Sequence, residues 1–186
     1  MDPEKPGELS EADAESLARA VQAGEDTVAV PAELTEEAAE EQPAEAREQT
    51  LYTRILAMPM GERIKLALRG NKDARTILLR DTNKLVRRFV LLNVRITDGE
   101  VIAVARNRNV DEEMLRIITQ RREWMRNYQV RLAIATNPKT PLPLALRQVA
   151  GLAERDLRQL AKSKNVPEAV AAHARRLLFA RREGPG

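Results

Sequence analysis

The spacing of asparagines ahead of apolar helical stripes restricts the fold of this chain more than any other feature of its sequence. Asn109, Asn137 and Asn165 follow one another at intervals of 28 residues, and each precedes a new apolar stripe, as does Asn71 earlier in the chain. Asparagine suits the turns between helices because it tolerates left-handed backbone and bonds to nearby backbone groups. We therefore interpret these four residues as structural. Repeated units of this length cannot bury their own apolar face, so they stack into a solenoid.

Residues 49–183 have the periodicity of helices throughout. Apolar residues recur there at helical spacing between turns that contain Pro, Gly or Asn. Thr97 and Glu100 form a capping box in front of one stripe, and Gly70 stands where a left-handed C-terminal cap is expected. The stripes predict an all-α domain of about nine short helices, which are too short and too many for a four-helix bundle.

Opposite charge separates the first part of the chain from the rest. Residues 1–50 hold fifteen acidic and three basic residues, whereas residues 51–186 hold 28 basic and 13 acidic residues. The acidic part has no aromatic side chain and is rich in Glu, Ala and Pro. Such a segment repels itself and buries too little surface to offset the entropy of ordering. We therefore predict a disordered acidic N-terminal tail over residues 1–48 and a helical repeat domain over residues 49–183.

One short stretch of the tail has helical character. Ser10 and Asp13 resemble a weak capping pair in front of the apolar residues Leu17, Ala18 and Val21. A single helix of this length is marginal in water. The pattern therefore predicts a short helix that folds against a partner.

The segment from Val130 to Leu146, VRLAIATNPKTPLPLAL, resembles the repeat unit of the HEAT-like and leucine-rich-repeat-variant helical repeat families. Their repeats read as a Val-Arg-x-x-x-Ala helix, an Asn-Pro-x-Thr-Pro turn and a Leu-rich second helix. The body also resembles an uncharacterised bacterial family of helical proteins through the phrases GERIKLAL, REWMRNY and AKSKNVPEAV, which implies no activity. The resemblance implies a right-handed α-solenoid of roughly 130 residues, a fold that usually binds other macromolecules along a surface.

The composition excludes several kinds of catalytic and binding site. The chain has no cysteine, which rules out disulfides, thiolate metal sites and cysteine nucleophiles. Its glycines do not form a phosphate-binding loop, and the only histidine, His173, and the only serine after residue 50, Ser163, lack a catalytic context. The run Asp111, Glu112 and Glu113 fits a first helical turn better than a metal or acid–base site. We expect no catalytic residue, metal, cofactor or small-molecule substrate.

The distribution of apolar residues argues against a membrane protein. No stretch approaches the roughly 18 apolar residues that a membrane span needs. The N-terminus lacks the basic start and apolar run of a signal peptide. We expect a cytoplasmic protein that does not contact a membrane.

A string of basic and aromatic residues is the strongest candidate for a binding site. Trp124 and Tyr128 stand four residues apart among several arginines, and the candidate partner-binding residues are Arg121, Arg122, Trp124, Arg126, Tyr128 and Arg131. Aromatic and arginine side chains dominate protein interfaces, and nucleic-acid bases stack on aromatic rings. The alternative interpretation is that Trp124 is buried between helices and the arginines form a solvated face.

Charge and fold class together predict a non-enzymatic interaction module. We expect its basic solenoid surface to bind an acidic protein surface or segment, with its own acidic tail able to compete for that surface. The alternative is a nucleic-acid-binding HEAT-like protein, which requires the positive charge to gather on one face. A base-excision enzyme of HEAT-like fold is disfavoured because the five aromatic residues of the body are scattered along the chain.

Overall fold

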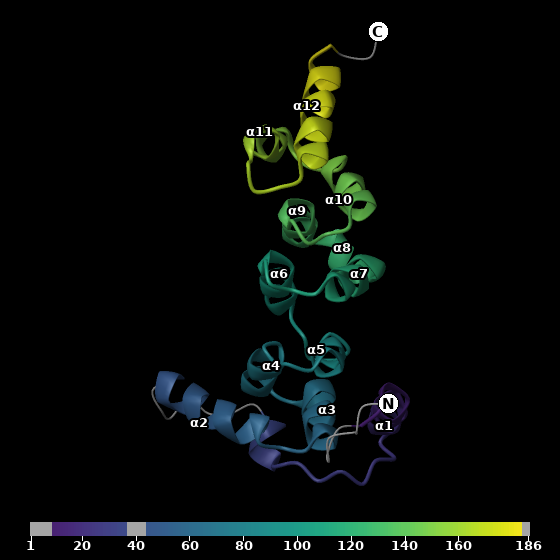
Figure 1. The fold of residues 1–186 in the computed structure, drawn as a ribbon, viewed down its shortest axis with the longest axis vertical. Helices are drawn as coiled ribbons and strands as arrows, with labels where there is room; N and C mark the ends of the chain where they lie inside the picture. The colour runs from purple at the N-terminus through teal and green to yellow at the C-terminus, as the bar shows by residue number, and fades with distance from the viewer. Residues whose placement is uncertain (1–8, 37–43, 184–186) are drawn as a thin grey trace, which may run out of the picture. The chain divides into compact units, whose positions relative to one another are not determined.

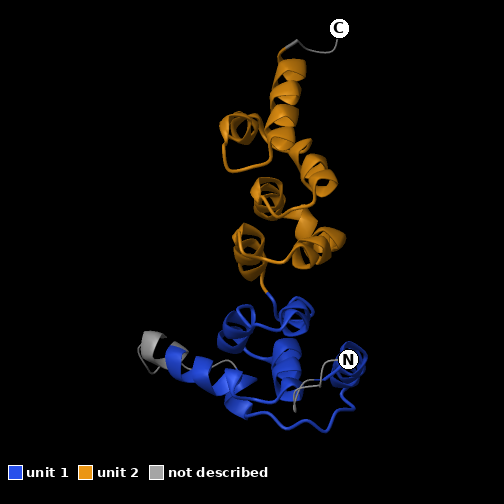
Figure 2. Cartoon of the chain, viewed as in Figure 1, with its two compact units in different colours: residues 1–96 blue, residues 97–186 orange. Residues whose placement is uncertain are grey.

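A computed structural model describes residues 9–36 and 44–183, and within these ranges the protein is all-α, with twelve α-helices, one 3₁₀ helix and no strand. The chain forms two compact units, residues 1–96 and 97–186 (Figure 2). The boundary predicted near residue 48 thus falls inside the first unit. The all-α prediction is confirmed for the described residues.

The helices are short in both units (Figure 1). Unit 1 contains α1 (Glu11–Ala23), a 3₁₀ helix (Ala32–Leu34), α2 (Ala44–Leu56), α3 (Met60–Arg69), α4 (Lys72–Leu78) and α5 (Lys84–Val90). Unit 2 contains α6 (Asp98–Arg106), α7 (Glu112–Gln120), α8 (Arg122–Arg126), α9 (Tyr128–Thr136), α10 (Leu142–Val149), α11 (Glu154–Lys162) and α12 (Glu168–Glu183). The count exceeds the predicted nine partly because Asn127 has extended backbone, which separates α8 from α9 within one predicted stripe.

The acidic N-terminal segment is folded over residues 9–36, so the prediction of a disordered tail is wrong there; residues 1–8 and 37–43 lie outside the described ranges. The predicted short helix is present as α1, and Ser10 caps it by accepting the N–H of Asp13 at 3.2 Å. Its apolar face, Ala14, Ala18 and Val21, is buried in the core of unit 1. The helix packs on α3 and α5, which supply the partner surface that a marginal helix needs.

Basic side chains of α3 and α5 hold the acidic segment. Arg88 forms an ion pair with Glu15 at 2.5 Å, and Lys65 forms one with Asp26 at 2.6 Å. Lys65 also donates to the carbonyl of Val28. These contacts offset the self-repulsion on which the prediction of disorder rested, because they place cations beside the carboxylates.

Three buried asparagines, each between two helices, donate their side-chain amide to backbone carbonyls of an earlier segment. The side-chain amide of Asn71 donates to the carbonyls of Glu33 and Glu36, at 3.0 and 2.7 Å. That of Asn93 donates to Ala67 and Gly70, and that of Asn137 donates to Ala105 and Asn107. The side-chain oxygen of Asn71 accepts the N–H of Ala74 as the N-cap of α4, and those of Asn93 and Asn137 accept the N–H groups of Arg95 and Lys139, two residues further on. An asparagine thus joins each of these turns to an earlier segment of the same unit: the residues around the 3₁₀ helix, the end of α3 and the end of α6.

The structure supports a structural role for Asn71 and Asn137 and separates them from Asn109 and Asn165, the other two asparagines predicted to be structural. Asn109 and Asn165 are exposed. Their backbone N–H groups donate to Asn107 at 2.9 Å and to the hydroxyl of Ser163 at 3.2 Å. Asn107, Asn137 and Ser163 are the equivalent residues of three turns, because each is a C-cap whose side chain accepts the N–H two residues later. These three residues are not evenly spaced in the sequence.

Gly70 does not adopt the predicted left-handed conformation. Its backbone is extended, with φ −61° and ψ 155°. A Cβ atom added at this position would lie 2.4 Å from the carbonyl oxygen of Leu66. Glycine is needed here because the backbone approaches too closely for any side chain.

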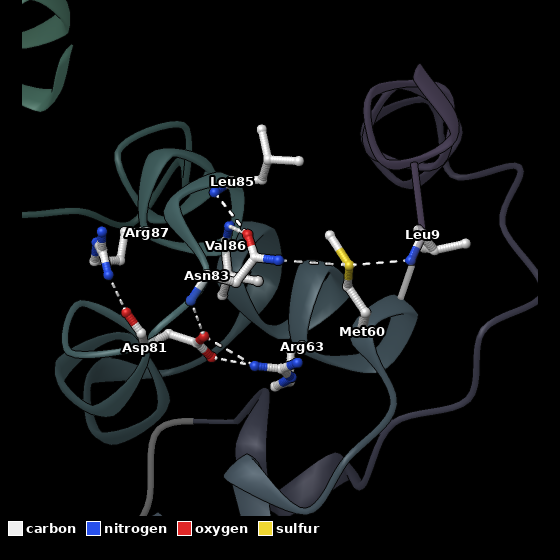
Figure 3. Close-up of polar contacts among 8 residues, drawn as sticks. All are labelled: Leu9, Met60, Arg63, Asp81, Asn83, Leu85, Val86 and Arg87. Atoms are coloured by element: carbon white, nitrogen blue, oxygen red, sulfur yellow. Dashed lines mark hydrogen bonds and ion pairs between the residues drawn. The ribbon is translucent and has the colours of Figure 1, made fainter. Parts of the chain in front are cut away.

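A buried carboxylate links α3 to the turn between α4 and α5 (Figure 3). Asp81 is fully buried and accepts two hydrogen bonds from the guanidinium of Arg63, at 2.9 and 2.7 Å. It also accepts the N–H of Asn83 at 2.8 Å, and Arg87 donates to its backbone carbonyl. A buried charge is tolerated only when it is paired and hydrogen-bonded, as it is here.

In unit 2, helices that are close in sequence pack on one another. Helix α9 contacts α6, α8 and α10, and α12 contacts α10 and α11. Val149, Leu157 and Val170 are among the buried residues of the core at the C-terminal end of this unit. The predicted capping box is present at α6, where Thr97 accepts the N–H of Glu100 and the carboxylate of Glu100 accepts the N–H of Thr97.

Candidate interaction surface

Trp124 of the basic and aromatic string belongs to the interior of unit 2. Its side chain is only 7% exposed on the short helix α8. The guanidinium of Arg121, the residue that caps α8, lies 5.2 Å from the centroid of the indole ring and makes a cation–π contact. A base or a partner side chain therefore finds little of this ring accessible.

Tyr128 connects α9 to the start of α11. Its hydroxyl donates to the carboxylate of Asp156 and accepts the backbone N–H of Ala153 at 3.0 Å. Burial raises the pKa of the Tyr128 phenol above 10.0, and the hydrogen bond to Asp156 raises the pKa further. Because both hydrogen-bonding functions of the hydroxyl are used, Tyr128 acts as a bridge between helices.

Arg131 packs against the ring of Tyr128 and near Gly151. Its guanidinium carbon lies 5.4 Å from the centroid of the Tyr128 ring. Its Nε atom is buried and, among the described residues, has no hydrogen-bond partner. The side chain also approaches Gly151, where an added Cβ would lie 3.3 Å from a guanidinium nitrogen. Arg131 is thus half-buried between α9 and the turn that follows α10.

Arg122 and Arg126 are the two predicted site residues that lie on the surface. Both side chains are exposed at the ends of α8. Neither makes a hydrogen bond, ion pair or ring contact within the part of the chain that the structure describes. The string therefore divides into an interior group, formed by Trp124, Tyr128 and Arg131, and two exposed arginines.

Net charge is distributed unevenly between the two units. Unit 1 holds 14 basic and 18 acidic residues, whereas unit 2 holds 17 basic and ten acidic residues. The acidic N-terminal segment thus more than compensates the basic residues of its own unit. The positive excess of the chain belongs to unit 2, which also carries Arg122 and Arg126.

A groove of about 870 Å³ in unit 1 was not predicted from the sequence. Its basic side chains are Lys65, Arg69 and Arg95, and its apolar ones include Leu68 and Val94, the latter 92% exposed. Each of the three basic side chains donates to a backbone carbonyl of the N-terminal segment. Three segments distant in sequence form the groove, so no local pattern could have revealed it.

The remaining chemical candidates of the sequence are ordinary surface or turn residues. Glu112 accepts from the Nε of Arg116 at 2.9 Å within α7, and Asp111 is the N-cap residue of that helix. His173 is half-buried on α12, and Ser163 ends α11. Among the described residues, no group of three or more His, Asp or Glu side chains could hold a metal ion.

Comparisons of the chain with protein-family models, with curated proteins and with solved structures found no match. Across the described ranges, every helix is too short or too polar to span a membrane. A function for this protein is therefore inferred from its residues and their contacts.

Proposed function

We propose that this protein is a non-enzymatic interaction module that binds an acidic protein surface or segment through the basic helices of unit 2. The contact centres on α8, where Arg122 and Arg126 are exposed. Within the described residues both lack an ion pair, so a carboxylate can bind them without breaking an existing contact. Arginine suits this role because its planar fork can donate two hydrogen bonds to one carboxylate.

The observation that carries this proposal is that acidic residues balance the basic residues in unit 1 but not in unit 2. In unit 1, Glu15 and Asp26 of the acidic segment already occupy Arg88 and Lys65. In unit 2, basic residues outnumber acidic residues by 17 to ten. An acidic partner therefore gains more by approaching unit 2, and this field also accelerates its association at low salt.

We propose that the acidic segment regulates binding through unit 1. The ion pairs given above for residues 9–36 reach Lys65 and Arg88, which belong to that unit. Competition by this segment would therefore free or occupy those side chains and not Arg122 or Arg126. A chain with Glu11→Gln and Glu15→Gln tests this, because it removes two acidic partners of Arg88 without altering the buried face of α1, and its affinity for an acidic peptide should differ from that of the wild type.

We also propose that the helices of this chain stack as a right-handed α-solenoid of HEAT-like type, as the sequence resemblance implies. The repeated contacts of Asn71, Asn93 and Asn137 support this proposal, since each joins a turn to an earlier segment of the same unit. Solenoids of this kind use a long surface for binding other macromolecules.

Nucleic acid is the second candidate partner, and the positive excess of unit 2 is the observation that favours it. Stacking of bases on Trp124 is disfavoured because the ring is 7% exposed and is covered by Arg121. Binding would then depend on phosphate contacts and would lack sequence preference.

The experiment measures binding of a labelled polyglutamate peptide and of a labelled DNA duplex to the full chain over a series of salt concentrations. The variant carries Arg122→Gln and Arg126→Gln. The matched control carries Arg147→Gln and Arg155→Gln, which remove the same charge from two other exposed residues of unit 2 that lack an ion pair in the described structure.

We expect the R122Q/R126Q chain to bind polyglutamate about tenfold more weakly, since each lost charge contact costs about 0.5–1 kcal/mol. The R147Q/R155Q chain should lose no more than about twofold through the general field. Equal losses in the two chains, or no peptide binding at low salt, would contradict the proposal. Tighter binding of the duplex than of the peptide, with a steep salt dependence, would favour nucleic acid.

A further inference from the structure

Three turns of unit 2 meet around a small polar pocket of about 200 Å³. The turns follow α6, α9 and α11, whose C-cap residues are Asn107, Asn137 and Ser163. The polar residues that line the pocket are Arg106, Arg108, Thr136, Asn137, Ser163 and Asn165. No acidic residue lines it, although unit 2 contains ten of them.

The hydrogen-bonding state of these residues leaves several donors available. Arg108 is exposed and makes no hydrogen bond, ion pair or ring contact with another side chain in the described structure. Arg106 gives one guanidinium nitrogen to Gln129 at 2.9 Å, so its other N–H groups remain available. The hydroxyl oxygen of Ser163 accepts the N–H of Asn165 at 3.2 Å, which leaves the hydroxyl hydrogen free to donate.

The size of the pocket limits what can bind there. Pockets for drug-sized molecules measure roughly 300–1,000 Å³. A pocket of about 200 Å³ holds only a small group. Two guanidinium groups, a hydroxyl and a carboxamide offer more donors than one carboxylate can use, whereas a phosphoryl group carries close to two negative charges and three acceptor oxygens. The donor set and the positive charge therefore match a phosphoryl group.

We infer that this pocket is a binding site for a phosphoryl group, which lies between the guanidinium groups of Arg106 and Arg108 and the polar side chains of Ser163 and Asn165. Cations are favourable at helix C-termini without any ligand, and this accounts for Arg106, the last residue of α6. Arg108 lies beyond the last turn of α6 and brings a second guanidinium group to the pocket. The C-termini of α6, α9 and α11 disfavour an anion, so a phosphoryl group binds only if the two guanidinium groups together outweigh them. The site is separate from the proposed contact at α8, and the inference does not depend on that contact.

The test is titration of the full chain with inorganic phosphate by calorimetry, at constant ionic strength and with chloride as the reference anion. Arg108→Gln is the test variant, because the side chain is exposed and its loss breaks no contact in the described structure. Arg147→Gln is the matched control, since Arg147 is an exposed arginine of α10 that does not line the pocket.

We expect the wild-type chain to bind phosphate, R108Q to bind it about tenfold more weakly, and R147Q to match the wild type within about twofold. A phosphoserine peptide and its unphosphorylated form distinguish the sources of the group. Competition of the phosphopeptide with phosphate identifies a phosphorylated protein as the ligand, and binding of phosphate alone identifies the free anion. No phosphate binding beyond that of chloride, or equal affinities of wild type and R108Q, would overturn the inference.

Discussion

The phenol of Tyr128 on α9 donates a hydrogen bond to the carboxylate of Asp156 in the first turn of α11. The same oxygen accepts the N–H of Ala153, the residue that precedes this helix. Tyr128, which the sequence predicts to contact a partner, thus links α9 to α11 within unit 2. The carboxylate that it meets lies 28 positions further along the chain.

Replacement of Tyr128 by Phe should lower the free energy of unfolding by about 1–2 kcal/mol, because the N–H of Ala153 and the carboxylate of Asp156 each lose a partner. Urea unfolding followed by circular dichroism measures the change. Tyr52→Phe is the control, since Tyr52 is 40% exposed and makes no hydrogen bond in the described structure. An equal effect of the two substitutions would contradict a bridging role for Tyr128.

The raised pKa of Tyr128 predicts a dependence of stability on alkaline pH. Between the unfolded pKa near 10.0 and the higher folded pKa, the folded protein binds more protons than the unfolded chain. The contribution of this group is therefore complete below pH 10 and is lost as the pH rises through the folded pKa. We expect the wild type to lose stability more steeply than Y128F above pH 10, and parallel pH profiles would contradict this prediction.

The carboxylate of Asp81 has no exposed surface, and Arg63 contacts both of its oxygens. Asp81→Asn should destabilise the protein by about 2–4 kcal/mol, because the Arg63 guanidinium is left largely buried without a counter-charge. The comparison is Glu112→Gln, which breaks an exposed ion pair with Arg116 and should cost no more than about 0.5 kcal/mol. Thermal or urea unfolding of both variants checks the difference, and similar losses would show that burial does not strengthen the Asp81 pair.

The contact of Asn137 with the end of α6 predicts an asymmetry among the asparagines of the 28-residue pattern. Asn137→Ala leaves the carbonyls of Ala105 and Asn107 without their donor and should cost about 1–3 kcal/mol. Asn109→Ala should change stability by less than about 0.5 kcal/mol, because Asn109 is exposed. Urea unfolding measures both, and a cost at Asn109 as large as that at Asn137 would contradict the assignment of roles.

Asp26 reports directly on whether the acidic segment is folded. The hydrogen bond from Lys65 holds the pKa of its carboxyl below the usual 3.8. The stabilisation from this group is present above the unfolded pKa and is lost as the pH falls through the folded pKa. We expect an NMR titration of the full chain to give a lowered pKa for Asp26 and a higher pKa after Lys65→Met, which removes the largest cause of the lowering. An ordinary pKa in the wild type would show that the segment is not docked.

Local features of the fold were predictable from the sequence because they depend on neighbouring residues. The capping box of Thr97 and Glu100 and the cap at Ser10 involve residues three positions apart, and both form as expected. The helical stripes likewise predicted an all-α structure. Gly70 was predicted wrongly because its requirement comes from the close approach of backbone atoms, which composition does not reveal.

The candidate site was predictable only in part. The pattern identified Arg122 and Arg126, which are exposed, but it could not separate them from Trp124 and Tyr128, which face other helices. Asn93 makes the same kind of contact as Asn71 and Asn137 but was not predicted, since it lies outside the 28-residue pattern. Helical periodicity predicts which face of a helix is buried. The segment that covers this face depends on packing between residues distant in the sequence.

Residue patterns alone establish that the chain is helical, where several helices begin, and that acidic and basic residues lie in separate stretches. Folding of the acidic stretch over residues 9–36 depends on packing, because Ala14, Ala18 and Val21 gain a core only when α3 and α5 lie beside them. Packing also decides which cations the acidic residues occupy, as in the pairs of Arg88 with Glu15 and Lys65 with Asp26. Coulomb attraction depends on distance in space, so the positive excess could be assigned to unit 2 only after the fold was known.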